Sequence, residues 1–322
     1  MSISPGTTKL PPREITNRFC IIFDYKINMM IKKIIVNKNY NFRIAKIKPI
    51  NEKIVNLVKR GEKENADNKF LEKLKKIKKN NLGNFIFLLR SLDFRLWEFP
   101  ENWVYKVYKK EKGFFGLMER AIGLFKVNNK DISFSLFRKI ISPKEGLSLA
   151  RLRYKVFKDS LRWLKNYDGN FDNYFEENKK AYDFCFNLFD LEKFRDFYKN
   201  FYFLKPNQLL YLEYILGKNL FKNYKDELED LTIFADYKLP QIFINFGLIE
   251  LPKKYLEKLK EGRMIRKFSL LENELRFASI LLGEEISKKL KIPSYRVDNI
   301  LWALSHKIKL KIPAPKVKTI FY

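Results

Sequence analysis

The apolar residues of this chain recur at helical spacing, and this periodicity constrains the fold more than any other feature of the sequence. In the second half, apolar side chains stand three or four positions apart, for example at Leu209, Leu212 and Ile215. Such spacing forms one stripe of an α-helix, which is stable when it packs against other elements. The segment Trp103–Tyr108 alternates with the period of a strand instead. The sequence therefore predicts a mainly α protein, a single helical domain with a small β insertion near residues 95–110.

The composition is that of a folded chain, because 46% of the 322 residues are apolar and 16% are aromatic. No apolar run reaches the roughly 18 residues that a membrane-spanning helix needs. Residues 1–28 are weakly patterned, contain Pro11 and Pro12 and lack the order of a signal peptide, so we expect a flexible N-terminal extension. Residues 29–322 would then form the domain. Two cysteines fit a reducing setting, and we expect a soluble, cytoplasmic monomer.

Histidine is almost absent from the chain, with His306 as its single example. Zinc sites use several histidine or cysteine ligands, and two cysteines with one histidine cannot supply a set of four. No metal site is therefore expected. A His-based catalytic triad has one candidate base in the whole chain. Catalysis must rest on carboxylates, lysines or tyrosines.

The strong positive charge has two interpretations. Lys and Arg number 65 and Asp and Glu 37, which gives a net charge of +28. A polyanionic partner such as nucleic acid would be attracted by this charge through counterion release. Alternatively, the charge reflects a general over-use of Lys together with Asn, Ile, Phe and Tyr. Because the lysines are scattered and do not alternate with aromatic residues, direct nucleic-acid binding is not expected.

Asp236 lies in a segment whose local structure can be predicted. Pro240 favours the first turn of a helix and Gly247 favours its left-handed end, which predicts a two-turn helix over residues 240–246. Asp236 would stand in the turn that enters this helix, where the positive end of the helix dipole stabilises a carboxylate. The sequence is equally compatible with a plain capping role and with a functional one.

Asp298 and Trp302 are four positions apart in a predicted helix that Ser294 can cap. This spacing puts a carboxylate and an indole on one stripe, beside the apolar face of the helix. Such a pair suits the cleavage of a glycosidic bond, because the ring stacks on the substrate while the anion stabilises an oxocarbenium-like sugar. The same spacing also arises often by chance, so the pair alone is a weak indication.

Two further C-terminal features receive structural interpretations. Ser269 and Glu272 form a capping box, and Glu272 is expected to pair with Arg276 on the surface of the same helix. Lys316 and Lys318 share one side of an extended tail. They either clamp a phosphate or stay solvated, and solvation is the default for such a pair.

Taken together, these segments resemble the queuosine salvage proteins, the queuosine 5′-phosphate N-glycosylase/hydrolase family. The segment Leu231–Gln241 is the most specific, since its Phe-Ala-Asp-Tyr-Lys-Leu-Pro-Gln corresponds to Phe-Ala-Asp-Tyr-Arg-hydrophobic-Pro-Gln in the family. The pattern Val-Asp-x-x-Leu-Trp and the closing Thr-Ile-Phe-Tyr match in the same order. The resemblance covers about residues 30–322, and its weaker matches are Leu92–Trp97, Lys112–Leu117 and Leu204–Leu210.

The resemblance implies an all-α fold similar to helical DNA glycosylases, with a small β insertion. It implies hydrolysis of queuosine 5′-monophosphate, a small-molecule substrate, to queuine and ribose 5-phosphate for queuine salvage into tRNA, without a metal or nucleotide cofactor. Asp298 would be the nucleophile or transition-state stabiliser at the anomeric carbon. The substrate-binding residues would be Phe234 and Asp236 at the base, Phe114 and Trp302 as pocket walls, Lys205 at the phosphate, and Asp93.

Two alternatives remain open at this point. The charge favours a basic helical nucleic-acid-binding protein or a DNA repair glycosylase, although no helix-hairpin-helix glycine signature is present. A structural protein that has lost activity is the other, because the chain departs from the family pattern. It has Ala303 where an acidic residue often follows the tryptophan, and Pro315, Lys316 and Lys318 where the family usually has His and Arg.

Overall fold

The computed structural model describes residues 40–62, 67–96, 113–127, 132–141, 149–198, 201–219 and 227–322. The extension predicted over residues 1–28 lies outside these ranges. Most of the β insertion expected near residues 95–110, including its strand candidate, also lies outside them.

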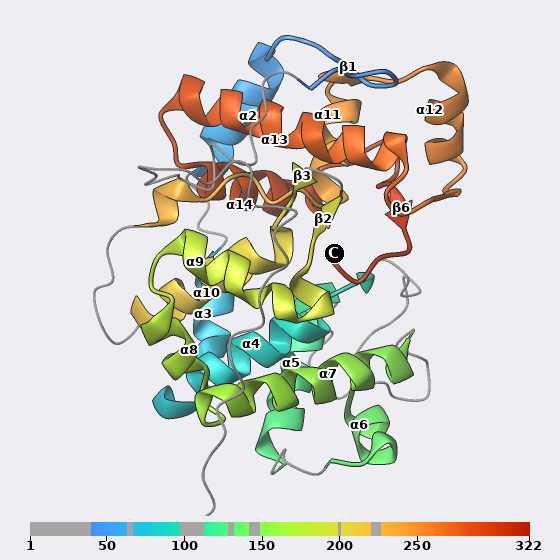
Figure 1. Cartoon of the computed structure of the whole chain (residues 1–322). Coiled ribbons are helices and arrows are strands. Elements are labelled where there is room, and N and C mark those ends of the chain that lie inside the picture. Colours follow the sequence, from blue (N-terminus) through green and yellow to red (C-terminus); the bar gives the residue numbers. More distant parts are fainter. Residues whose placement is uncertain are drawn as a thin grey trace, which may run out of the picture.

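Helices dominate the described chain, which confirms the predicted mainly α class (Figure 1). The likeness to helical DNA glycosylases stays a prediction. The helices of seven residues or more are α2 (Glu52–Glu62), α3 (Asp67–Leu74), α4 (Leu82–Leu92), α5 (Gly113–Lys126), α6 (Phe134–Ile141), α7 (Ala150–Leu164), α8 (Phe171–Glu177), α9 (Ala181–Asn187), α10 (Lys205–Asn219), α11 (Lys238–Asn245), α12 (Lys253–Lys260), α13 (Leu270–Leu290) and α14 (Ser294–Ser305).

The strands in the described residues are two residues long, and each pairs with one other strand and so connects two loops. β1 (Lys46–Ile47) and β4 (Ile249–Glu250) are antiparallel, as are β2 (Phe197–Tyr198) and β3 (Phe201–Tyr202). β5 (Met264–Ile265) and β6 (Lys316–Val317) are parallel, so the C-terminal tail is held beside the loop before α13.

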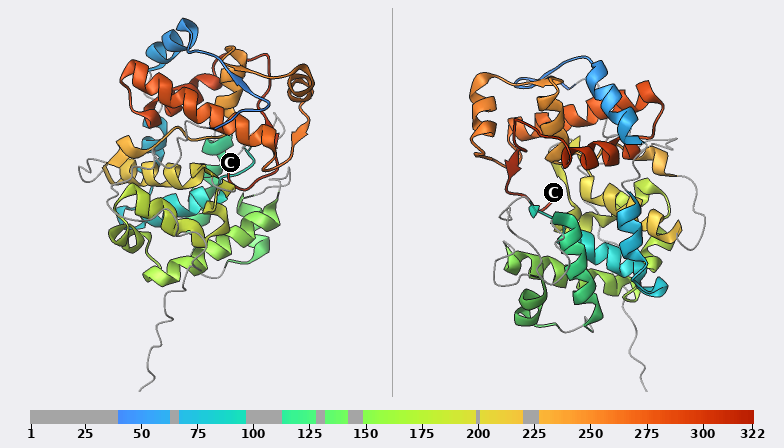
Figure 2. Two further views of the ribbon diagram at one scale, coloured as in Figure 1. Left: turned by 45° about the horizontal axis from the view of Figure 1, so that its top comes forward. Right: turned by 180° about the vertical axis from the view of Figure 1, so that it is seen from behind.

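The helices pack as two groups, each with its own apolar core. α3 to α10 surround one core, and α2 with α11 to α14 surrounds the other. Figures 1 and 2 show the second group at one end of the molecule and the first at the opposite end. Within the described part of the chain, no helix combines the length and the apolar character needed to cross a lipid bilayer.

α13 begins as the sequence predicts but is more deeply buried than expected. The Ser269 hydroxyl accepts a 3.3 Å hydrogen bond from the Glu272 main-chain nitrogen, and the Glu272 carboxylate accepts from the Phe268 nitrogen. The Glu272–Arg276 pair, at 3.9 Å, is not on the surface, because its side chains are only 3% and 2% exposed. Both apolar cores pack against this helix, which is why its charged residues are enclosed as well.

The helix predicted to follow Asp236 and the helix predicted to carry Asp298 both form. α11 starts at Lys238, two residues before the prediction, and Gly247 beyond its end has a φ of +73°. In α14 the apolar face predicted from the sequence is buried, and it consists of Val297, Ile300, Leu301 and Leu304. Ser294, however, does not cap the helix. Its hydroxyl instead lies 3.2 Å from that of Ser287 in α13 and joins the two helices.

Candidate active site

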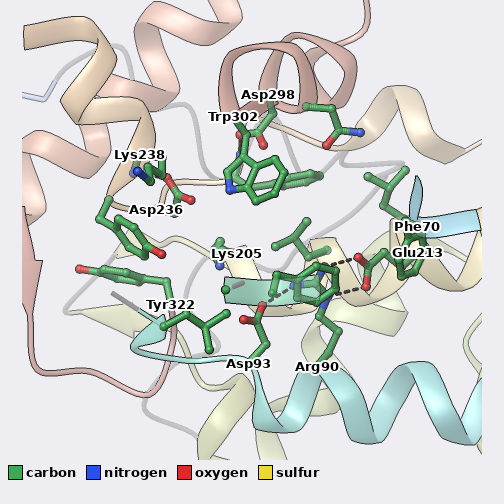
Figure 3. A pocket seen from close by; sticks show the side chains of 18 of the residues that line it. Phe70, Arg90, Asp93, Lys205, Glu213, Asp236, Lys238, Asp298, Trp302 and Tyr322 are labelled. Carbon is green, nitrogen blue, oxygen red and sulfur yellow. Dashed lines mark hydrogen bonds and ion pairs between the residues drawn. The ribbon is translucent and has the colours of Figure 1, made fainter. Parts of the chain in front are cut away.

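A cavity of about 320 Å³ opens between the two groups of helices, with lining residues from both (Figure 3). This volume lies in the range of sites for small organic ligands. The cavity brings together all seven residues that the resemblance assigned to the site. They are Asp93 after α4, Phe114 in α5, Lys205 in α10, Phe234 and Asp236 before α11, and Asp298 and Trp302 in α14.

Asp236 caps the start of α11 and also lines the cavity. Its Oδ1 accepts hydrogen bonds of 2.7 Å from the Lys238 nitrogen and 3.2 Å from the Leu239 nitrogen, at the start of α11. These bonds and the helix dipole stabilise negative charge on the carboxylate. The side chain is 7% exposed and lines the cavity. The cap therefore holds a charged group against the space that a ligand would fill.

Asp298 is buried in the same cavity but has a different environment. Its Oδ1 accepts a 2.9 Å hydrogen bond from the Phe234 main-chain nitrogen. Burial and the nearby charge of Asp236 raise its pKa well above the usual range, while the Phe234 bond and the charge of Lys205 oppose this shift. The carboxyl therefore keeps its proton to a higher pH than an ordinary aspartate. Two carboxyl groups in unlike environments are typical of acid–base sites.

Lys205 supplies a buried positive charge. It is the first residue of α10, follows Leu204 in the left-handed region at φ +49°, and is 8% exposed. Among the described residues, its ammonium group forms no hydrogen bond or ion pair, and it lines the cavity. Burying an unpaired charge is costly, so this group is suited to an anionic ligand.

A buried ion-pair cluster, not predicted from the sequence, lies on the cavity wall opposite Asp236 and Asp298 (Figure 3). In this cluster Arg90 donates hydrogen bonds to both Asp93 and Glu213. Arg90 also lies 4.2 Å from the centre of the Phe114 ring. Burial opposes ionisation of Asp93, but the charges of Arg90, Lys205 and Lys193 outweigh it and lower its pKa. For Glu213 burial prevails, and its pKa is raised. The signal was available, because Arg90 is the one charged residue of α4, a helix whose residues are mostly apolar.

The rim of the cavity holds the chain's single histidine, which sequence analysis did not place in the site. Nδ1 of His306 lies 2.8 Å from the Trp302 carbonyl oxygen, and the two rings are 4.6 Å apart between centroids. Partial removal from water and the charge of Lys238 lower the pKa of His306. Lys238 itself lines the cavity, and burial lowers its pKa despite the favourable charge of Asp236.

The C-terminal tail contributes Ala314 and Tyr322 to the lining rather than its lysines. Lys318 is exposed, and neither Lys316 nor Lys318 is a lining residue. Ala303 does not line the cavity either. Among the described residues, no group of three or more His, Cys, Asp and Glu side chains could hold a metal ion.

Comparison with known proteins points to one family. A family model described as queuosine salvage protein matches residues 73–322 of this chain. Several curated relatives carry the name queuosine 5′-phosphate N-glycosylase/hydrolase. The protein from Sphaerobacter thermophilus is 32% identical over 103 residues, which is 30% of this chain and 32% of the relative. The Mus musculus protein is 30% identical over 112 residues, 30% of this chain and 33% of the relative.

The longest of these matches is to the protein of Schizosaccharomyces pombe, 28% identical over 157 residues. It covers 42% of this chain and 45% of the relative, so the chain spans less than half the length of these curated relatives. The family model covers most of the chain, including all seven cavity residues predicted from the sequence. The chain therefore belongs to the queuosine salvage protein family.

Proposed function

We propose that this protein hydrolyses the N-glycosidic bond of queuosine 5′-monophosphate and releases queuine and ribose 5-phosphate, so that queuine can return to tRNA. The observation that carries the proposal is that Asp236, Asp298 and Lys205 line one cavity. The printed names of the curated relatives support the reaction. They give no support to the nucleic-acid-binding alternative. The proposal takes the protein to act as a monomer in the cytoplasm.

The rate of this reaction depends mainly on how well the protein stabilises the charges that develop in the transition state. The bond between C1′ of the ribose and the base nitrogen breaks with its electron pair passing to the base, and water supplies a hydroxyl to C1′ and a proton to the base. A 7-deazapurine has carbon where a purine has N7, so the usual site of leaving-group protonation is missing. More of the barrier must then be met by stabilising the sugar cation and the departing anion.

Asp298 is the proposed catalytic group because it is a fixed, buried carboxyl in the cavity. The Phe234 nitrogen holds one of its oxygens. In the ionised form it stabilises positive charge at C1′ or attacks that carbon, as carboxylates do in glycoside hydrolysis. Its raised pKa means that ionisation requires a higher pH than for an ordinary aspartate. A positive charge developing on the sugar favours the same ionised form.

The remaining lining residues would bind the two ends of the substrate. Phe234, Phe114 and Trp302 offer aromatic faces for a planar base. Asp236 would accept hydrogen bonds from the guanine-like edge of queuine or from its ammonium group. Lys205 would bind the 5′-phosphate as a charge-assisted donor. In Figure 3, Asp236 and Asp298 lie on the side opposite Asp93 and Arg90, with Lys205 between them.

The direct test is to incubate purified protein with queuosine 5′-monophosphate and to follow free queuine by mass spectrometry. The proposal predicts release by the wild type and by Asp183→Asn, a matched control in which an exposed aspartate of α9 changes. It predicts no detectable release by Asp298→Asn. A folded wild-type protein that neither binds queuosine 5′-monophosphate nor releases queuine from it would refute the proposed reaction.

A further inference from the structure

Arg276 of α13 is a buried cation outside the cavity lining, with only 1% of its surface exposed. Its guanidinium group forms a two-bond fork with Asp196, at 2.9 Å from Nη1 to Oδ1 and 2.6 Å from Nη2 to Oδ2. Asp196 is itself fully buried. Two bonds of this kind fix the plane of the guanidinium group as well as its position.

The third side of the same guanidinium group reaches the loop that carries the base-binding residues. Nε of Arg276 donates a 3.0 Å hydrogen bond to the main-chain oxygen of Ala235. Ala235 stands between Phe234 and Asp236, both of which line the cavity. The orientation of this peptide group therefore depends on the Arg276 fork.

Asp196 extends the connection to Lys205. Its main-chain oxygen accepts hydrogen bonds of 2.9 Å from the Phe203 nitrogen and 3.3 Å from the Leu204 nitrogen. The Phe203 ring lies 3.8 Å from the guanidinium carbon of Arg276. Leu204, with its left-handed backbone, directly precedes Lys205. The chain enters α10 from a turn that is attached to the Arg276–Asp196 pair.

Tyr322 is connected to the same group. Its ring centre lies 4.7 Å from the Arg276 guanidinium carbon, and its hydroxyl donates to Glu272. Glu272 in turn lies 3.9 Å from Nη1 of Arg276. Three segments that contribute to the cavity wall therefore meet at one guanidinium group behind it. They are the Phe234–Asp236 loop, the turn that leads into Lys205, and the C-terminal Tyr322.

We propose that Arg276 is a positioning residue that sets the distance between the base-binding loop and Lys205, and hence between the two ends of the bound substrate. The proposal rests on the proposed function for its kinetic test. The planar fork of arginine makes three directed contacts, to Asp196, Ala235 and Phe203, and a lysine ammonium cannot reproduce them. Small displacements of binding groups are expensive in catalysis, about 100-fold for 1 Å.

The test is a double-mutant cycle with Arg276→Lys and Lys205→Gln, read as kcat/KM for queuosine 5′-monophosphate. Arg276→Lys keeps the charge and loses the fork, and we expect a decrease of about 10- to 100-fold in the wild-type background. If Arg276 acts through Lys205, the same change costs less than about 3-fold once Lys205 is replaced by Gln. Equal losses in both backgrounds would overturn the proposal, because a general structural defect is additive.

A second variant and a structural measurement complete the test. Phe203→Leu removes the stacked ring but no charge, and it replaces Arg276→Lys in the cycle if the lysine variant does not fold. A crystal structure of either variant gives a readout that is independent of catalysis. We expect the Ala235 carbonyl and Lys205 to move relative to each other, and unchanged positions would overturn the proposal. Absence of activity in the wild type would refute the hydrolase reaction and leave this structural readout to decide the role of Arg276.

Discussion

The main-chain nitrogen of Phe234 donates a 2.9 Å hydrogen bond to Oδ1 of Asp298, a residue 64 positions further along the chain. This bond joins the loop before α11 to the helix α14, so the proposed base-binding wall and the proposed catalytic carboxyl are held in one geometry. A carboxyl fixed in this way needs no reorganisation when charge develops on the substrate. Two of the most specific sequence motifs of the chain thus meet at a single contact.

Asp298→Asn is predicted to abolish catalysis without harming the fold. Asparagine keeps the shape and the oxygen that accepts from Phe234, but it cannot become an anion. Loss of a charge-stabilising group in an active site costs at least about 100-fold in rate. Because burial disfavours the charged carboxyl of Asp298, the variant should unfold at an equal or higher temperature than the wild type. Release of queuine at the wild-type rate would remove Asp298 from the catalytic role.

The pH dependence of activity should show the raised pKa of Asp298. An ordinary aspartate titrates near pH 3.9, and burial together with Asp236 moves Asp298 well above this range. Because the anion is the active form, kcat/KM should rise with pH through the raised value rather than be constant above about pH 5. A profile that falls over the same interval would show that the protonated form is the active one.

The same shift predicts how stability changes with pH. The pKa of Asp298 is higher in the folded than in the unfolded state, so the folded state is relatively favoured below the unfolded value and loses this advantage as pH rises through the folded value. The stability advantage of Asp298→Asn over the wild type should therefore grow with pH across this window. Urea titrations of both proteins at several pH values measure it, and a difference that is independent of pH would contradict the shift.

Lys205→Gln is predicted to weaken binding of the phosphorylated substrate selectively. A hydrogen bond to a charged group contributes about 1.5–3 kcal/mol, which corresponds to roughly 10- to 150-fold in KM. The matched control is Lys165→Gln, which changes an exposed lysine directly after α7 and should leave KM unchanged. If Lys205→Gln and Lys165→Gln behave alike, the phosphate is bound elsewhere.

Gly283→Ala is predicted to disturb the site through the residue before Phe234. A Cβ atom at Gly283 would lie 2.1 Å from Cγ1 of Ile233, so α13 and this loop could no longer approach as closely. Overpacking of this kind costs about 1–3 kcal/mol of stability. Thermal melts and queuine release should both decrease. Adding Ile233→Ala removes the two atoms that would lie closest to the new Cβ and should restore part of the activity. A further decrease in activity would argue against this explanation.

The sequence was sufficient to predict those features that depend on residues close to one another in the chain. Pro240 and Gly247 mark α11, and the four-residue spacing of Asp298 and Trp302 places both on one side of α14. These local signals located two walls of the cavity. The resemblance to a family added residues from distant segments, among them Lys205 and Asp93, which the structure brings to the same cavity.

Features that depend on tertiary packing were not predictable in this way. Arg90 and Glu213 are 123 positions apart, and no local pattern pairs them. The Glu272–Arg276 spacing correctly indicated a pair, yet it could not show that both apolar cores cover that helix. Helical periodicity reports which face is apolar, whereas the burial of a charged face depends on what packs against it.

The central claim is tested most directly by a crystal structure of Asp298→Asn bound to queuosine 5′-monophosphate. The account predicts the base against Phe234 and Trp302, C1′ facing the substituted side chain of α14, and the phosphate within about 2.7–3.2 Å of Nζ of Lys205. A nucleotide bound outside this cavity, or bound in it with the sugar turned away from position 298, would contradict the account.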